Sequence, residues 1–190
     1  MRFEHHVPAQ AKKTRKLTLD LFARGASIFA MLISNNVMAS TPAPAHTASL
    51  TRSINVNGSP ATVWAAIGPF CSISEWHPAI ASCSEDGKSP PTRTLKTRDG
   101  DATFIELQTA RNTIRHSYSY SYTFISAPIP VTNYNSTLSV FANGHGGSTV
   151  RWSGVYRPNP GMDRAAANAL SGIYVSGLQS IQARLAKRKR

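Results

Sequence analysis

Hydrophobic and polar residues alternate along much of the middle of the chain. The clearest stretch runs from Arg115 to Ser126, where Tyr118, Tyr120, Tyr122 and Phe124 occupy every second position among serines and threonines. A period of two places these four rings on one face of a sheet. Similar patterns predict further strands at residues 53–57, 92–97, 102–109, 133–142 and 148–156.

Two parts of the chain have helical patterns instead. Ser59 is a suitable N-cap and Pro60 a suitable first helical residue, so we expect a short helix through Ile67 and then an irregular helical segment at residues 70–80. From Asp163 onward apolar residues recur at intervals of three and four, which predicts one long amphipathic helix. Its expected buried face consists of Ala166, Leu170, Ile173, Tyr174, Gly177, Leu178, Ile181 and Leu185.

The order of these elements predicts an α+β fold. A strand, two short helices, a run of antiparallel strands and a final long helix keep helices and strands apart along the chain. An antiparallel sheet with one apolar face must be covered, and the final helix is the one long element that can cover it. We therefore expect a curved antiparallel sheet wrapped around this helix, with side chains or a cavity between them.

A series of short motifs occurs in this order: Ser59-Pro60-x-x-Val63-Trp64, Trp76-His77-Pro78, Arg93-Thr-Leu95, Glu106, Tyr120-Ser-Tyr122, Pro130-Val-x-x-Tyr134, Ser136-Thr-Leu-x-Val140, Ser148-x-Val-x-Trp152-x-Gly154 and Tyr174-x-x-x-Leu178. In this order and spacing, residues 51–186 resemble the Bet v 1/START-like superfamily, in its bacterial polyketide cyclase/dehydratase-type branch. The resemblance implies a helix-grip fold with an internal cavity for a lipid, a polyketide or an aromatic molecule. It implies much less about chemistry, because a fold does not fix a function.

Ten residues are candidates for the wall of this cavity. Those of the Trp76-His77-Pro78 motif are placed near the cavity mouth by the resemblance, and His77 is the candidate proton donor or acceptor. Arg93 and Glu106 could pair across the cavity floor. The alternative for each candidate is ordinary packing or, for Arg93 and Glu106, exposure on a strand. The set is Trp76, His77, Arg93, Glu106, Tyr118, Tyr120, Tyr122, Tyr134, Trp152 and Tyr174.

Three hypotheses for function follow. The first is a binding protein that holds a small hydrophobic or amphipathic molecule. The second is a polyketide cyclase/dehydratase-like enzyme that uses His77 or a tyrosine as acid or base. The third is an envelope protein that binds a partner. The sequence has no G-x-S-x-G, H-E-x-x-H, P-loop or dinucleotide motif, and its histidines are scattered, so we expect no metal or cofactor.

The net charge of +12 is concentrated near the two ends of the chain. Between Thr51 and Ala183, ten basic residues face seven acidic ones, so a folded basic surface for nucleic acid is not expected. The basic tail, residues 187–190, could contact an anionic membrane surface weakly.

The first 39 residues have the pattern of an export signal. The basic stretch at residues 12–16 precedes the short apolar run from Ala26 to Ile33, and Val37-Met38-Ala39 suits cleavage before Ser40. The run is too short to span a bilayer. We expect a periplasmic or secreted protein, or a cytoplasmic one if the leader does not function, with a disordered linker at residues 40–50.

The two cysteines, Cys71 and Cys83, fit neither a CxxC motif nor metal-ligand spacing. We interpret them as two buried free thiols, with a structural disulfide as the alternative.

Overall fold

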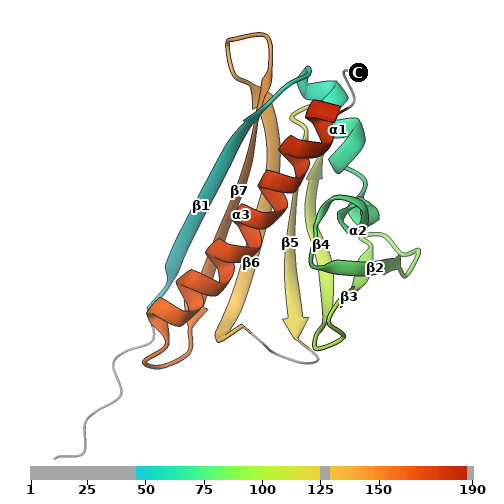
Figure 1. Cartoon of the computed structure of the whole chain (residues 1–190). Coiled ribbons are helices and arrows are strands. Elements are labelled where there is room, and N and C mark those ends of the chain that lie inside the picture. The colour runs from blue at the N-terminus through green and yellow to red at the C-terminus, as the bar shows by residue number, and fades with distance from the viewer. Residues whose placement is uncertain (1–45, 125–128, 188–190) are drawn as a thin grey trace, which may run out of the picture. The chain divides into compact units, whose positions relative to one another are not determined.

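In the described part of the chain, seven strands form one curved antiparallel sheet, and a long helix lies against its concave face (Figure 1). The structure, a computed structural model, describes residues 46–124 and 129–187, without the side chains of residues 117–119 and 122–124. The leader at residues 1–39, most of the expected linker and the last three residues of the basic tail lie outside this part. Among the described helices, none has the length and apolar character needed to cross a membrane.

The elements follow the expected order. They are β1 (Ala48–Val56), α1 (Pro60–Ile67), the 3₁₀ turn η1 (Phe70–Ser72), α2 (Ile73–Trp76), β2 (Ile80–Glu85), β3 (Thr92–Thr97), β4 (Thr103–Asn112), β5 (Ser117–Phe124), β6 (Val131–Ala142), β7 (Ser148–Pro158) and α3 (Asp163–Lys187).

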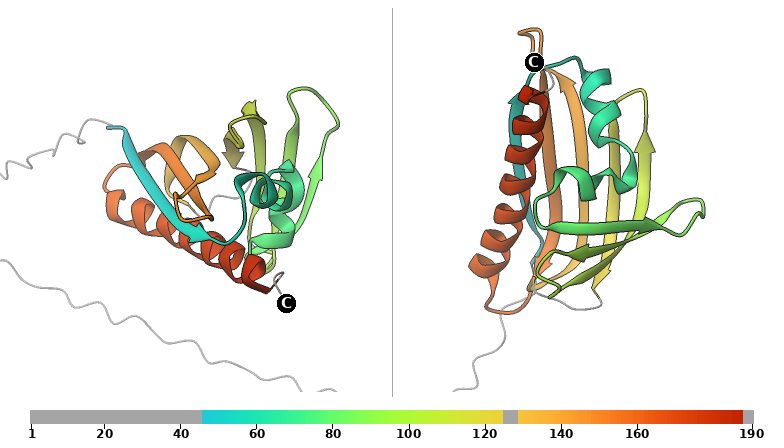
Figure 2. Two further views of the ribbon diagram at one scale, coloured as in Figure 1. Left: turned by 90° about the horizontal axis from the view of Figure 1, so that it is seen from above. Right: turned by 45° about the vertical axis from the view of Figure 1, so that its right-hand side comes forward.

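The strand order is β1-β7-β6-β5-β4-β3-β2. The strands from β2 to β7 therefore form a meander, and its last strand, β7, pairs with β1. The sheet curls around α3, and α1, η1 and α2 close one side (Figure 2). The predicted α+β helix-grip fold is confirmed.

Two strands differ most from the prediction. β1 begins at Ala48 rather than at residue 53, because residues 48–50 continue the antiparallel pairing with β7. They are therefore strand and not linker. β2 was not predicted at all, since Ile80-Ala-Ser-Cys-Ser-Glu85 is short and rich in small residues, and it forms an edge of the sheet that pairs with β3 alone.

The position of α3 depends on a glycine. A Cβ atom at Gly177 would lie 2.8 Å from Cδ2 of His77 and 2.9 Å from Cζ3 of Trp152. These distances are shorter than real side-chain contacts, so only glycine lets α3 come this close to both rings. The rest of the predicted helix face is buried as expected, from Ala166 through Leu170 and Tyr174 to Leu185, except that Ile173 is half-buried.

His77 links the segment after α2 to α3 through hydrogen bonds. Its Nε2 lies 3.1 Å from the carbonyl oxygen of Ile173, and its Nδ1 accepts a hydrogen bond from the N–H of Ala79 at 3.2 Å. A neutral ring with the proton on Nε2 satisfies both contacts. Burial lowers the pKa of His77 below its ordinary value, more than the hydrogen bond to Ile173 raises it, and the charge of Arg93 lowers it further.

Cys71 of η1 and Cys83 of β2 form a disulfide. The interpretation as two free thiols is therefore corrected. The spacing of 12 residues could not reveal the pairing, because it depends on β2 returning alongside η1.

We predict that Gly177→Ala lowers the free energy of unfolding by about 2 kcal/mol, the typical cost of overpacking a core. Gly172→Ala is the matched control, because it lies on the same helix and a Cβ there meets nothing within 4 Å. This control should stabilise the protein by about 1 kcal/mol, since alanine is the better helix former. Urea unfolding measures both effects, and equal effects would contradict the close packing at Gly177.

We also predict that the wild-type protein loses stability as the pH falls through about 6.5, the ordinary pKa of histidine. The folded pKa of His77 lies below that of the unfolded chain, so the unfolded state binds the extra proton in this window. His77→Gln should remove this component, up to about 1.4 kcal/mol per pH unit for one proton. Thermal unfolding between pH 5 and 8 measures it. His145→Gln, at an exposed loop position, should keep the wild-type slope.

Candidate functional site

A cavity of about 280 Å³ lies between the N-terminal half of α3 and the sheet. Its wall is mostly apolar. The helical and β2 sides contribute Ile73, His77, Ala79, Ile80, Ala169, Leu170 and Ile173. The sheet and the residue after the undescribed segment contribute Leu95, Thr97, Phe104, Glu106, Tyr120, Ile129, Tyr134 and Trp152.

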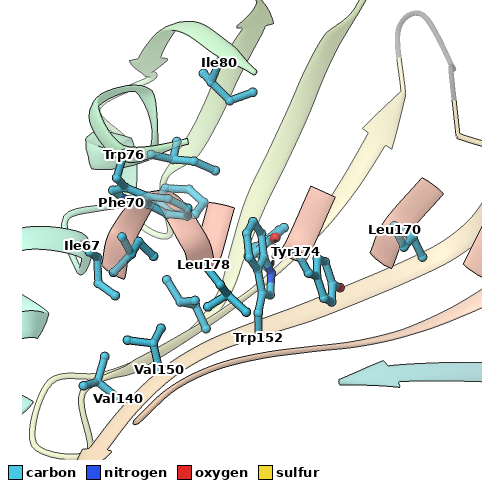
Figure 3. Close-up of a cluster of buried hydrophobic side chains, with 14 of the residues drawn as sticks. Ile67, Phe70, Trp76, Ile80, Val140, Val150, Trp152, Leu170, Tyr174 and Leu178 are labelled. Atoms are coloured by element: carbon cyan, nitrogen blue, oxygen red, sulfur yellow. Dashed lines mark hydrogen bonds between the residues drawn. The ribbon is translucent and has the colours of Figure 1, made fainter. Parts of the chain in front are cut away.

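Stacked aromatic rings stand at one side of the cavity. The rings of Trp152 and Tyr174 are parallel within 7°, with centroids 4.6 Å apart, and Trp76 meets Trp152 edge-on at 5.7 Å. Figure 3 shows these rings between α3 and the sheet, with Leu178 lying toward Val140 and Val150 beyond them. Core side chains therefore fill the space between the C-terminal half of α3 and the sheet, and the cavity lies near the other half.

A buried ion pair reaches the cavity from β3 and β4. Arg93 is fully buried, and both its Nε and its Nη2 lie 2.6 Å from Oε2 of Glu106. The two residues are directly opposite each other in the antiparallel pairing of β3 with β4. Arg93 also donates from Nη1 to the carbonyl oxygen of Phe70, and its guanidinium lies 4.0 Å above the Phe70 ring.

Glu106 is the member of this pair that lines the cavity. Both described contacts with Arg93 use Oε2 of this carboxylate. Burial raises the pKa of the Glu106 carboxyl above its ordinary value, and the positive charge of Arg93 offsets part of this rise. Since an arginine stays charged in proteins, the pair together presents a hydrogen-bond acceptor without a net charge.

A chain of hydroxyl groups supports the aromatic wall. Ser136 donates to the carbonyl oxygen of Ser153 at 2.9 Å and accepts from Nε1 of Trp152 at 2.9 Å. Its third contact, at 3.0 Å, is with the hydroxyl of Tyr174, which must then donate to Ser136. The hydroxyl of Tyr134 lies 2.6 Å from that of Tyr174 and donates to it in turn.

The two tyrosines of this hydroxyl network, Tyr134 and Tyr174, are neutral hydrogen-bonding groups. Burial raises the pKa of Tyr174 to about 12, and burial raises the pKa of Tyr134 well above its ordinary value. Neither is ionised near neutral pH, so neither acts as a base there. Gly154 makes room for the network, because a Cβ at this position would collide with the hydroxyl of Tyr174.

Of the candidates taken from the sequence, five line the cavity: His77, Glu106, Tyr120, Tyr134 and Trp152. Three others are buried one layer behind its wall: Trp76, Arg93 and Tyr174. The side chains of Tyr118 and Tyr122 lie outside the described part of the structure.

Other wall and network residues were not singled out from the sequence. Ala169 lies next to the buried stripe of α3, and Ser136 is two residues after Tyr134 on the same strand. Ile173 was expected on the buried face of the helix but not as a cavity residue. The period of two could have placed Ser136 beside Tyr134. Nothing in the sequence distinguishes the cavity-facing part of α3 from its packed part.

Within the described residues, no group of three His, Cys, Asp or Glu side chains could hold a metal ion. The cavity itself combines a mostly apolar wall with a small number of hydrogen-bonding groups.

Comparison with known proteins fits this geometry. Residues 47–186 match the family described as "Polyketide cyclase / dehydrase and lipid transport". No curated protein matches the chain. Among solved structures, the protein XoxI from Bacillus cereus is 36% identical, with a TM-score of 0.69 over 75% of this chain and 99% of that one.

More distant structures share the fold alone. The Zhui aromatase/cyclase from a Streptomyces species is 14% identical, with a TM-score of 0.61 over 76% of this chain and 97% of its own. Norcoclaurine synthase from Thalictrum flavum is 13% identical, with a TM-score of 0.60 over 77% of this chain and 98% of its own. The resemblance drawn from the sequence motifs is confirmed, and the chain belongs to the polyketide cyclase/dehydrase and lipid transport family.

Proposed function

We propose that this chain is an exported binding protein that holds a small, uncharged, mostly apolar molecule in the cavity under α3. The observation that carries the proposal is the wall of that cavity, where apolar and aromatic side chains stand around the buried carboxylate of Glu106. Ligand sites commonly combine an apolar wall with a few placed polar groups. At about 280 Å³ the cavity is near the small end of such sites, which favours a ligand of one or two rings.

The charge of the site supports an uncharged ligand with a hydrogen-bond donor. Arg93 already neutralises Glu106, so a ligand ammonium or carboxylate would bring an unpaired charge into an apolar space, at a large cost. A hydroxyl group can donate to the Glu106 carboxylate without adding charge. A hydrogen bond to a charged acceptor contributes about 1.5–3 kcal/mol.

The engagement of the candidate proton-transfer groups favours a binding protein over an enzyme. Both ring nitrogens of His77 are held by backbone groups, and the hydroxyls of Tyr134 and Tyr174 bond to each other. A general acid or base has to reach the substrate with a suitable pKa. His77 would have to give up a contact that holds α3 in order to do so.

Two observations support export. The leader pattern ends at a cleavage motif before Ser40, and Cys71 is bonded to Cys83. Structural disulfides persist mainly in oxidising compartments outside the cytosol.

We expect 2-naphthol to bind at least tenfold more tightly than 2-methylnaphthalene, which has the same rings without the hydroxyl. The factor follows from the hydrogen bond to Glu106. Calorimetry measures both affinities. Ala169→Phe, which fills the cavity, should abolish binding of both compounds, and Ala165→Phe, at an exposed site on the same helix, should leave both affinities unchanged.

Equal affinity for the two compounds would show that Glu106 is not an anchor. Absence of binding by either compound, with no small molecule released from the purified protein on denaturation, would contradict the binding function itself.

For export, we expect the chain isolated from its own cells to have the mass of residues 40–190 and to be recovered outside the cytoplasm. Intact-mass measurement of fractionated cells tests this. The full-length mass in the cytoplasmic fraction would contradict it, and Ala39→Asp, which spoils the cleavage motif, should retain the leader.

A further inference from the structure

The disulfide between Cys71 and Cys83 lies between the cavity wall and the protein surface. Both cysteines are half-buried and line a groove of about 440 Å³ on the side away from the cavity. This groove runs between α1, α2 and the last turns of α3, where Arg184 contributes to its wall. The two cysteine residues therefore border this groove on its outer side.

On its other side the disulfide is tied to the ligand anchor. Phe70, the residue before Cys71, accepts a hydrogen bond from Arg93 and packs its ring under the same guanidinium. Arg93 in turn holds Oε2 of Glu106. The position of η1 and the direction of the Glu106 carboxylate are thus linked through a single buried side chain.

The other half of the disulfide belongs to the cavity wall. Cys83 is paired with Leu95 across β2 and β3, and both Leu95 and Ile80, the first residue of β2, line the cavity. The bond from Cys71 to Cys83 therefore fixes η1, which orients the anchor, to the strand that carries part of the apolar wall.

We propose that this disulfide is a redox-controlled clasp on the cavity, and that its reduction weakens ligand binding. The inference rests on the binding function proposed above. Reduction lets η1 move away from β2, so the carbonyl of Phe70 no longer fixes Arg93, and Glu106 loses its orientation toward the cavity. The wall that closes over the ligand loosens in the same event.

The chemical step requires a dithiol reductant. One of its thiolates attacks a sulfur atom of the clasp from the groove and forms a mixed disulfide, releasing the other cysteine as a thiolate that takes up a proton. The second thiol of the reductant then attacks the mixed disulfide. Cys71 and Cys83 end as two thiols, having gained two electrons and two protons, and the reductant ends as a disulfide.

Thermodynamic linkage makes the effect reciprocal. If the oxidised protein binds the ligand more tightly by some factor, the ligand must favour the disulfide over the dithiol by the same factor. For a two-electron couple, a tenfold factor corresponds to about 30 mV.

The experiment uses the full chain and 2-naphthol as the probe. Binding is measured by calorimetry on the oxidised protein and on protein reduced with dithiothreitol. We expect an affinity about tenfold weaker after reduction, within the usual range for coupled sites. The midpoint potential of the disulfide, measured in dithiothreitol redox buffers, should become more negative by about 30 mV with saturating 2-naphthol.

The variant carrying both Cys71→Ser and Cys83→Ser is the control for reagent effects. Its affinity should equal that of the reduced wild type and should not respond to dithiothreitol. If this variant does not fold, the potential shift in the wild type still decides the matter, because it requires no substitution.

Three results would overturn the proposal. Equal affinities before and after reduction, with no potential shift, would reject the clasp and leave the binding function intact. Loss of the cooperative unfolding transition on reduction would mean that the bond holds the whole fold rather than the cavity wall. Failure of the oxidised protein to bind 2-naphthol would remove the binding function together with the clasp.

Discussion

The close contact of α3 with the sheet at Trp152 determines how the interior of this protein is divided. Gly177 lets the helix approach the rings of Trp152 and His77, and Gly154 lets the hydroxyl of Tyr174 reach the hydroxyl of Ser136 on the sheet. Because these contacts fix α3 near its middle, the side chains beyond them pack tightly around its C-terminal half. The space around its N-terminal half is left between a curved sheet and a straight helix, and that space is the cavity.

The packing of α3 accounts for the cavity, and the buried pair of Arg93 and Glu106 gives it polar character. Such a pair costs free energy unless each member is well satisfied. Arg93 contacts a carboxylate oxygen, a backbone carbonyl and the ring of Phe70, and Glu106 is the member that lines the cavity. In the proposed function, the pair supplies the polar contact of the cavity as well as a link between β3 and β4.

His77, the candidate acid or base, makes contacts that hold the fold together. It lines the cavity and belongs to the motif that the resemblance places near the cavity mouth, but its nitrogens bridge Ile173 of α3 and Ala79 before β2. The His77 ring thereby links the segment before β2 to α3, and the disulfide links β2 to η1. Together, the two links hold η1, α2 and β2 over the cavity, and both can respond to solution conditions, one to pH and one to a thiol reductant.

The sequence by itself determined the elements and their faces. A period of two along the strands and of three to four along α3 specifies which side chains must avoid water, and this is local information that survives without knowledge of the fold. The α+β class, the buried stripe of α3 and the cavity positions of Tyr120, Tyr134 and Trp152 could therefore be predicted. Only the tertiary structure decided which inward residues meet one another. The disulfide, the bond from Arg93 to Phe70 and the bond from His77 to Ile173 all join segments separated in sequence, at distances that depend on the register and curvature of the sheet. Periodicity gives the face on which a residue lies but not its neighbour across the core. Those neighbours determine whether an inward side chain is available to a ligand or links two parts of the fold.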